Sequence, residues 1–141
     1  MGALDLLEQV PIFESLSVEE IEELAEATRE IDVPAGTELT HEGRYEGYVF
    51  LVISGTVGIE RDGRTVDRIG PGDFFGEIAA VDGGPRTATA RSLEDCLLLT
   101  VDHEHFYRVL EASPEVRAAV MDAMEARLGR IDSETAAQPE G

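Results

Sequence analysis

The fold is decided by residues 48–72, which read YVFLVISGTVGIERDGRTVDRIGPG. The three apolar or alternating runs in this stretch are residues 48–53, 56–61 and 64–69. Each run is followed by a turn that contains glycine, a pattern typical of antiparallel strands. The turn Asp62-Gly63 predicts a two-residue hairpin, in which Gly63 supplies the positive φ that such a turn requires.

The same pattern continues on both sides of this stretch. Glycine turns also occur at Pro34–Gly36 and Glu42–Gly43, and further runs lie at Thr87–Ser92 and Cys96–Val101. Short strands separated by regular turn signals are typical of a small closed β structure. We therefore expect a mainly β fold, an antiparallel jelly-roll barrel over residues 30–102, with helices on both flanks.

Helix signals precede the predicted barrel. Ser17 and Glu20 have the spacing of a capping box, in which each side chain bonds the backbone of the other residue. Apolar residues recur at helical spacing behind it, which predicts a helix over residues 18–28. The N-terminal helical part is expected over residues 12–29, with a short additional helix at residues 4–9.

Helical spacing returns after Asp102, which is expected to cap the next helix. Ser113 and Pro114 then start a second helix, with a capping hydroxyl and proline at the first helical position. The C-terminal helices are expected over residues 103–131, and a flexible tail is expected over residues 133–141. No DNA-binding element is expected after the last helix.

Composition limits the partners. The chain has 141 residues, with 30 Asp and Glu against 11 basic residues, all of them Arg, and its formal net charge is −19. The length favours one domain, expected at residues 1–132. Its charge repels phosphate backbones and anionic lipids, so neither nucleic acid nor a membrane is an expected partner. The absence of Lys fits codon bias in a G+C-rich genome and equally a salt-rich cytoplasm.

Two further absences bear on location and redox chemistry. No apolar run approaches the length of a membrane span, and the first residues lack the basic region of a signal peptide, which predicts a cytoplasmic protein. Cys96 is the one cysteine, so an intrachain disulfide is excluded. We expect Cys96 to be a small core residue.

Residues 72–90, GDFFGEIAAVDGGPRTATA, carry the chemistry. One helical turn is expected directly after Gly76, and its N-terminus offers unpaired N–H groups to an anion. Arg86 adds a planar fork that matches two phosphate oxygens, and Thr87 adds a hydroxyl donor. Because the carboxylate of Glu77 repels phosphate, it suits a ligand that also carries hydroxyl donors. The segment therefore predicts a site for a sugar phosphate with a free hydroxyl.

This segment closely resembles the phosphate-binding cassette of cyclic nucleotide-binding domains. That family includes the bacterial catabolite activator protein and the regulatory subunits of cyclic-nucleotide-dependent protein kinases. The likeness lies in FGEIA at residues 75–79 and PRTAT at residues 85–89, so residues 75–90 are identified as the cassette. Glycines 36, 43, 55 and 72 are similar to the family's turns, which extends the resemblance over roughly residues 13–131.

The resemblance implies a non-catalytic sensor without a cofactor, whose ligand is cAMP, cGMP or both. It implies that Glu77 binds the ribose 2′-hydroxyl and that Arg86 binds the cyclic phosphate. A hydroxyl residue after the arginine is associated in the family with tolerance of guanine, so Thr87 keeps cGMP open beside cAMP. The implied ligand-binding residues are Gly76, Glu77, Ile78, Ala79, Arg86, Thr87 and Ala88.

Two other interpretations stay open. Glu77 and Arg86 could instead form a salt bridge that holds a long loop together. In that case the domain is degenerate: it binds no ligand and only mediates dimerisation or protein interaction. A cupin-like metalloenzyme would need several histidines at one metal. His103 and His105 point about 200° apart on a helix, and His41 stands alone.

The last helix carries Met121, Met124, Leu128 and Ile131 at 3-4-3 spacing. This stripe suits either packing on the chain's own barrel or pairing with a second copy, and we expect a homodimer through it. Ligand binding is expected to reposition this helix, and an effector protein that the sequence does not identify would detect the change. Arg117, Met121 and Met124 are the candidates for contact with the base.

Overall fold

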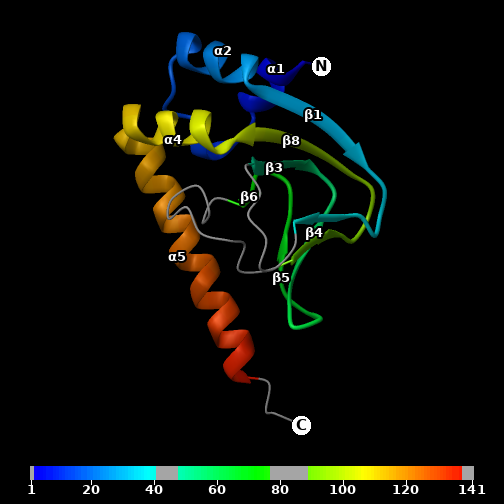
Figure 1. Ribbon diagram of the computed structural model, residues 1–141. Coiled ribbons are helices and arrows are strands. Elements are labelled where there is room, and N and C mark those ends of the chain that lie inside the picture. The colour runs from blue at the N-terminus through cyan, green and yellow to red at the C-terminus, as the bar shows by residue number, and fades with distance from the viewer. Residues whose placement is uncertain (1, 41–47, 77–88, 138–141) are drawn as a thin grey trace.

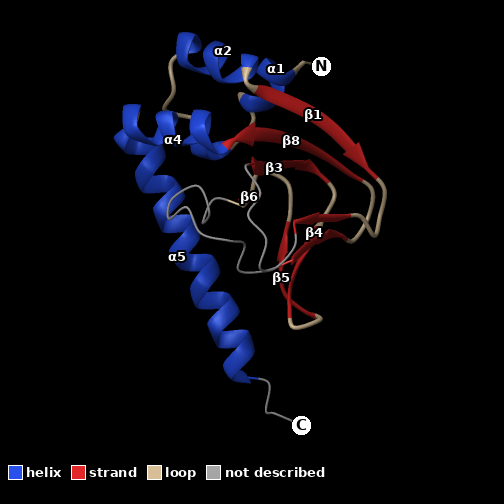
Figure 2. Cartoon of the chain, in the orientation of Figure 1, coloured by secondary structure: helices blue, strands red, loops and turns tan. Residues whose placement is uncertain are grey.

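Helices lie on one side of the molecule and β-sheets on the other (Figures 1 and 2). The computed structural model describes residues 2–40, 48–76 and 89–137, with residues 127–137 described by their backbone. The helices are α1 (Ala3–Leu7), the 3-10 helix η1 (Pro11–Phe13), α2 (Val18–Glu26), α4 (His103–Ala112) and α5 (Pro114–Ala137). The strands are β1 (Thr28–Val33), β2 (Glu38–Thr40), β3 (Tyr48–Ser54), β4 (Val57–Arg61), β5 (Arg64–Ile69), β6 (Phe74–Phe75), β7 (Thr89–Ser92) and β8 (Cys96–Asp102).

The strands of the described residues form two antiparallel sheets. The first has the order β1-β8-β3-β6, and the second has the order β2-β7-β4-β5. Side chains from both sheets meet in one apolar core. The predicted mainly β jelly roll with flanking helices is therefore confirmed, although the two sheets stay separate instead of closing into the expected barrel.

β3, inside the first sheet, is buried on both faces. Successive side chains of a strand point to opposite faces. Val49 and Leu51 pack into a core formed with the helices, whereas Phe50 and Val52 pack into the core between the sheets. The uninterrupted apolar run of β3 follows from these two buried faces.

The helical core joins both ends of the chain. Its central side chains are at most 2% exposed, namely Leu7, Phe13, Phe106, Val116 and Val120. Burying an apolar side chain of this size contributes about 1.5–3 kcal/mol relative to leaving it in water. The N-terminal helices, α4 and the start of α5 are therefore fastened to one face of the first sheet.

The N-terminal capping box is confirmed, and the helix behind it is shorter than predicted. The Ser17 Oγ accepts from the Glu20 N–H at 3.2 Å, and the Glu20 Oε1 accepts from the Ser17 N–H at 3.0 Å. Helix α2 ends at Glu26, because Thr28 already starts β1. The Thr28 hydroxyl donates to the Leu24 carbonyl at 2.7 Å and closes the end of the helix.

Three described strands, β1, β2 and β6, are absent from the strands predicted from the sequence. β1 carries mostly exposed and half-buried side chains, and β2 and β6 are very short. Each is defined by its partner, which is β8 for β1, β7 for β2 and β3 for β6. The sheets consequently begin at Thr28, before the expected boundary at residue 30.

The turn between β4 and β5 has the predicted geometry. Asp62 has a φ of 54° and Gly63 a φ of 78°, both positive as a type I′ turn requires. A β-carbon at Gly63 would meet no heavy atom within 4 Å. Glycine is therefore favoured at this position by the backbone conformation and not by crowding.

Both C-terminal helices begin where the sequence predicts. The Asp102 Oδ1 accepts from the His105 N–H at 2.8 Å and caps α4. The Ser113 Oγ accepts from the Val116 N–H at 3.3 Å and caps α5. Such caps satisfy backbone donors that have no partner within the helix.

Helix α5 is longer than predicted and faces two ways. It runs from Pro114 to Ala137, so residues 133–137 of the expected flexible tail are helical. Met124 is buried in the helical core, whereas Met121 is 38% exposed. Met121 and Met124 of the predicted stripe therefore divide between surface and core, about 60° apart around the helix, and the side chains of Leu128 and Ile131 lie outside the described residues.

Candidate functional site

The segment at residues 75–90 connects the two sheets. β6 ends at Phe75 in the first sheet, and β7 begins at Thr89 in the second. The described structure therefore defines where the segment leaves one sheet and enters the other. Gly76 is described, whereas the other predicted binding residues lie outside the described residues, namely Glu77, Ile78, Ala79, Arg86, Thr87 and Ala88.

The entry to the segment is held on β3. The Gly72 N–H donates to the Val52 carbonyl at 2.8 Å, and the Val52 N–H donates to the Asp73 carbonyl at 2.9 Å. Phe75 stacks on Phe50 with ring centroids 4.8 Å apart and planes within 2° of parallel. Both rings are buried, so β6 cannot shift without opening the core between the sheets.

Gly76 marks the point where the chain leaves β6. Its φ is 91°, a value that residues with a β-carbon rarely adopt. Its carbonyl lies 3.2 Å from the Nε2 of His103, the first residue of α4, which is 8% exposed. Because a carbonyl oxygen only accepts, the Nε2 of His103 carries the proton and donates. This contact joins the entry of the segment to the C-terminal helices.

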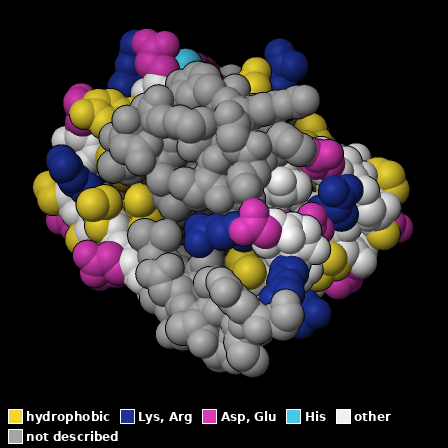
Figure 3. Space-filling model, turned by 60° about the horizontal axis from the view of Figure 1, so that its bottom comes forward, with side chains coloured by type: hydrophobic (Ala, Val, Ile, Leu, Met, Phe, Trp, Pro, Cys, Tyr) yellow, Lys and Arg dark blue, Asp and Glu magenta, His cyan; other side chains and the backbone are white. Residues whose placement is uncertain are grey.

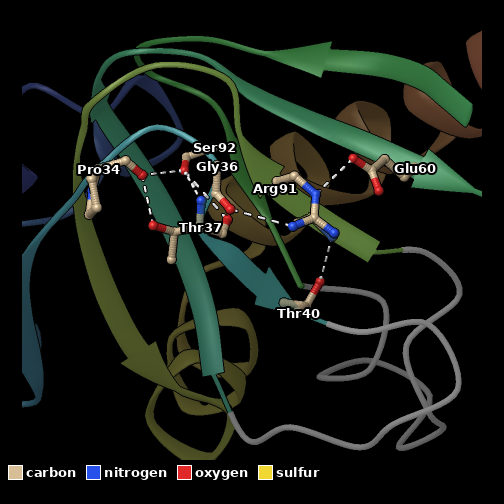
Figure 4. A network of polar contacts seen from close by, with 8 residues as sticks. Pro34, Gly36, Thr37, Thr40, Glu60, Arg91 and Ser92 are labelled. Carbon is tan, nitrogen blue, oxygen red and sulfur yellow. Dashed lines mark hydrogen bonds and ion pairs between the residues drawn. The ribbon is translucent and has the colours of Figure 1, made fainter. Parts of the chain in front are cut away.

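The exit from the segment is held by neighbouring strands. The Ala90 N–H donates to the Thr40 Oγ1 at 3.1 Å. Arg91 donates from Nε to the Glu60 Oε2 at 3.1 Å and from Nη1 to the Gly36 carbonyl at 3.4 Å (Figure 4). A planar guanidinium shared between a carboxylate on β4 and a carbonyl beside β2 fixes β7 between its two partners.

Ser92 completes this network at the end of β7 (Figure 4). It is 1% exposed, and its Oγ donates to the Pro34 carbonyl at 2.7 Å and accepts from the Thr37 N–H at 2.8 Å. The sequence does not indicate the contacts of Thr40, Arg91 or Ser92. Their partners lie between 31 and 58 positions away, beyond the reach of any local pattern.

The described histidines do not share a site. The Nδ1 of His105 lies 2.7 Å from the Asp102 Oδ2, whereas His103 bonds the Gly76 carbonyl. Within the described parts of the chain, no three His, Cys, Asp or Glu side chains are grouped as metal ligands would be. His41 lies outside the described residues.

Cys96 has the environment of a core residue, as predicted. It is 3% exposed and belongs to the core between the sheets. Burial raises the pKa of its thiol, which disfavours the reactive thiolate. The thiol donates to the Glu94 carbonyl at 3.2 Å.

The candidate residues for contact with the base, all on α5, differ in their exposure. Arg117 and Met121 are exposed, whereas Met124 packs into the domain's own core. On the face that Figure 3 presents, arginine and carboxylate side chains are interspersed.

None of the helices in the described residues has the length and apolar character needed to cross a membrane.

A family comparison covers most of this architecture. The model of the cyclic nucleotide-binding domain matches residues 30–113. The matched region includes β2 to β8, α4 and both flanks of the segment at residues 75–90.

Individual relatives agree with the family match. A cyclic nucleotide-gated potassium channel of Rhizobium etli is 31% identical over 125 residues, which cover 88% of this chain and 35% of the channel. The regulatory domain of Toxoplasma gondii PKA, co-crystallised with cAMP, is 32% identical with a TM-score of 0.68, and the match covers 76% of this chain and 42% of that one. The catabolite activator protein of Thermus thermophilus is 29% identical with a TM-score of 0.71, over 89% of this chain and 61% of that one. The chain thus spans less than two thirds of each of these relatives.

Proposed function

This chain belongs to the cyclic nucleotide-binding domain family, and from that premise we propose that residues 1–132 form a non-catalytic sensor domain for cAMP or cGMP. The family match across residues 30–113 carries the proposal. It is supported by the flanks of the segment at residues 75–90, which β6 and β7 hold on different sheets. These flanks are themselves held in place, by the stacking of Phe75 on Phe50 and by the ion pair of Arg91 with Glu60.

Two side chains recognise the ligand in this proposal. The guanidinium of Arg86 pairs with the cyclic phosphate, whose oxygens match its planar fork. The carboxylate of Glu77 accepts the ribose 2′-hydroxyl. Backbone N–H groups complete the site, from Gly76, Ile78, Ala79, Thr87 and Ala88.

The size of the ligand sets the expected affinity. A cyclic mononucleotide has about 22 non-hydrogen atoms, and about 0.3 kcal/mol per atom gives roughly 7 kcal/mol. This binding free energy corresponds to a Kd in the micromolar range. Both cAMP and cGMP are therefore to be titrated over that range, and Thr87 is the residue expected to let guanine bind.

Arg86→Ala is expected to abolish measurable binding of either nucleotide. Removing one partner of a charge-assisted pair costs about 2–5 kcal/mol, which is about a third to two thirds of the expected binding free energy. Arg86→Lys is also expected to bind poorly, because a point charge replaces a bidentate fork. Isothermal titration calorimetry measures all three proteins.

Arg29→Ala is the matched control, because Arg29 is exposed on the edge strand β1. It removes the same charge from the chain and is expected to leave binding unchanged. Equal affinity of wild type and Arg86→Ala contradicts the role assigned to Arg86. Absence of heat and of any thermal shift with both nucleotides in the wild type contradicts the sensor function and favours an interaction module.

The proposal also includes a response in the C-terminal helices. A ligand shifts a conformational equilibrium only by contacting two states differently, and α5 is the element that we expect to differ between them. Met121 leaves an apolar side chain exposed on α5. We further propose that two copies of the chain pair through α5.

A further inference from the structure

His103 lies between the candidate site and the C-terminal helices. It is the first residue of α4 and is 8% exposed, although its imidazole is polar. Its Nε2 donates to the Gly76 carbonyl at 3.2 Å, across 27 positions of sequence. The hydrogen bond is partly buried, between the buried ring and half-buried Gly76, so water can replace the lost donor only in part.

The strand that leads to Gly76 is fixed. β6 pairs with β3, and Phe75 stacks on Phe50 in the core between the sheets. Gly76 itself adopts a positive φ where the chain leaves the strand. Its carbonyl is therefore placed by the fold, one residue before Glu77.

The α4 end is connected to α5. Phe106 and Leu110 of α4 are buried in the same core as Val116 and Val120 of α5. α4 leads directly into α5, which runs away from the N-terminal helices (Figure 1). Packed cores transmit displacement because they hold few voids, so a shift of the first turn of α4 also moves α5.

We propose that His103 is the positioning residue that couples the Gly76 backbone to α4 and α5. Because β6 is fixed, the movable part is the Gly76 carbonyl at its end: a rotation of this carbonyl moves the imidazole, and the imidazole moves the first turn of α4. The coupling is carried by one hydrogen bond, which joins the end of β6 to the start of α4. Each of these elements is packed against the rest of the domain. Its part in a ligand response rests on the proposed function.

Three variants separate this role from general stability. His103→Leu fills the space but removes the donor, and leaves the Gly76 carbonyl without it. His103→Gln places an amide N–H₂ at a similar distance from the backbone and can restore the hydrogen bond. His105→Leu is the matched control, because His105 lies in the same helical turn but contacts Asp102 instead of Gly76.

The first measurement needs no ligand. Hydrogen–deuterium exchange, read by mass spectrometry, follows amides of residues 72–76 and of α4 in the free protein. We expect His103→Leu to accelerate exchange in both regions together, His103→Gln to recover protection in both, and His105→Leu to affect α4 alone. Acceleration of α4 without any change at residues 72–76 overturns the coupling.

The second measurement adds cAMP or cGMP, with affinity determined by calorimetry on the same samples. We expect His103→Leu to bind within about tenfold of wild type, a loss within the usual range of coupling between sites. We also expect it to lose the ligand-induced change of exchange in α4 and α5. His103→Gln is expected to regain that change. A full response in His103→Leu, or an equal loss in His105→Leu, overturns the proposal.

The two measurements distinguish failure of the sensor function from failure of the role of His103. If the wild type binds neither nucleotide, the proposed function is contradicted, and the free-protein exchange still decides whether His103 couples Gly76 to α4. If the wild type binds and responds but His103→Leu responds equally, the sensor function stands and the role of His103 is wrong.

Discussion

Gly55 lies in the turn between β3 and β4, where the backbone passes directly over Cys96. Its φ is 91°, and a β-carbon there would lie 2.6 Å from both the Cys96 Sγ and the Asp95 carbonyl oxygen. Gly36 has a similar φ of 86°, but no heavy atom lies within 4 Å of its β-carbon position. The two glycines therefore separate the cost of a backbone conformation from the cost of a steric contact.

Gly55→Ala is expected to destabilise the protein more than Gly36→Ala. Both substitutions share the cost of a positive φ, and only Gly55→Ala adds the cost of overpacking a filled core, about 1–3 kcal/mol. Urea unfolding gives the two free energies of unfolding. Equal losses in the two variants would contradict the close approach of this turn to Cys96.

At the scale of elements, Asp102 ends β8 and starts α4. Partial burial disfavours its ionised form, but hydrogen bonds from the His105 backbone and ring, with the charges of His105 and Arg108, outweigh burial. The pKa of Asp102 therefore lies below its ordinary value of 3.8. Because folding lowers this pKa, the ionised carboxylate stabilises the fold above the ordinary value, and that contribution is lost as the pH falls through the lower folded value.

Asp102→Asn tests this dependence, because asparagine keeps a capping oxygen but does not ionise. The wild type is expected to be more stable than Asp102→Asn at about pH 6, and the difference is expected to shrink by about pH 3. Asp102→Ala also loses the cap, at about 0.5–2 kcal/mol. Urea unfolding across this pH range measures the differences. A difference between wild type and Asp102→Asn that grows on acidification runs against the assigned direction of the pKa.

The same element scale explains why β1 escapes prediction. Its alternation is confined to residues 30–33, where exposed Glu30 and Asp32 alternate with half-buried Ile31 and Val33, and so short a run is a weak strand signal. β8 supplies the missing information, since residues 28–33 pair in continuous register with residues 96–101. The full extent of such a strand is decided by its partner and not by the local sequence alone.

At the scale of the whole molecule, the net charge opposes the proposed pairing of two copies. Each copy carries a formal net charge of −19, so two copies repel in solution. Pairing through α5, with Met121 exposed on it, has to overcome that repulsion. Salt weakens the repulsion, since the screening length is about 10 Å at 0.1 M and about 3 Å at 1 M.

The proposed homodimer is therefore expected to strengthen with salt. Analytical ultracentrifugation should show a dimer fraction that rises between about 0.05 M and about 0.5 M NaCl. Met121→Glu should abolish the dimer by placing a charge in the seam. Val18→Glu is the control, because Val18 is 64% exposed and lies on α2 instead of α5. A dimer that persists in Met121→Glu would show that α5 is not the seam.

The sequence by itself determined the features that depend on near neighbours. The Ser17 capping box, the Asp62-Gly63 turn and the start of α5 at Pro114 each involve groups only a few residues apart. Their chemistry is written in a short stretch of chain, so it can be predicted before the path of the chain is known. The motifs at residues 75–79 and 85–89 likewise identified the family, because both are contiguous in sequence.

Only the tertiary structure decided the contacts between distant positions. The first sheet has to bury two faces, one against the helices and one against the second sheet. Packing of the first sheet against the helices brings His103 to Gly76, and pairing of β7 with β4 in the second sheet brings Arg91 to Glu60; these pairs are separated by 27 and 31 positions. A polar residue carries no local sign of which distant partner burial will bring to it, and these partners hold both flanks of the candidate site in place.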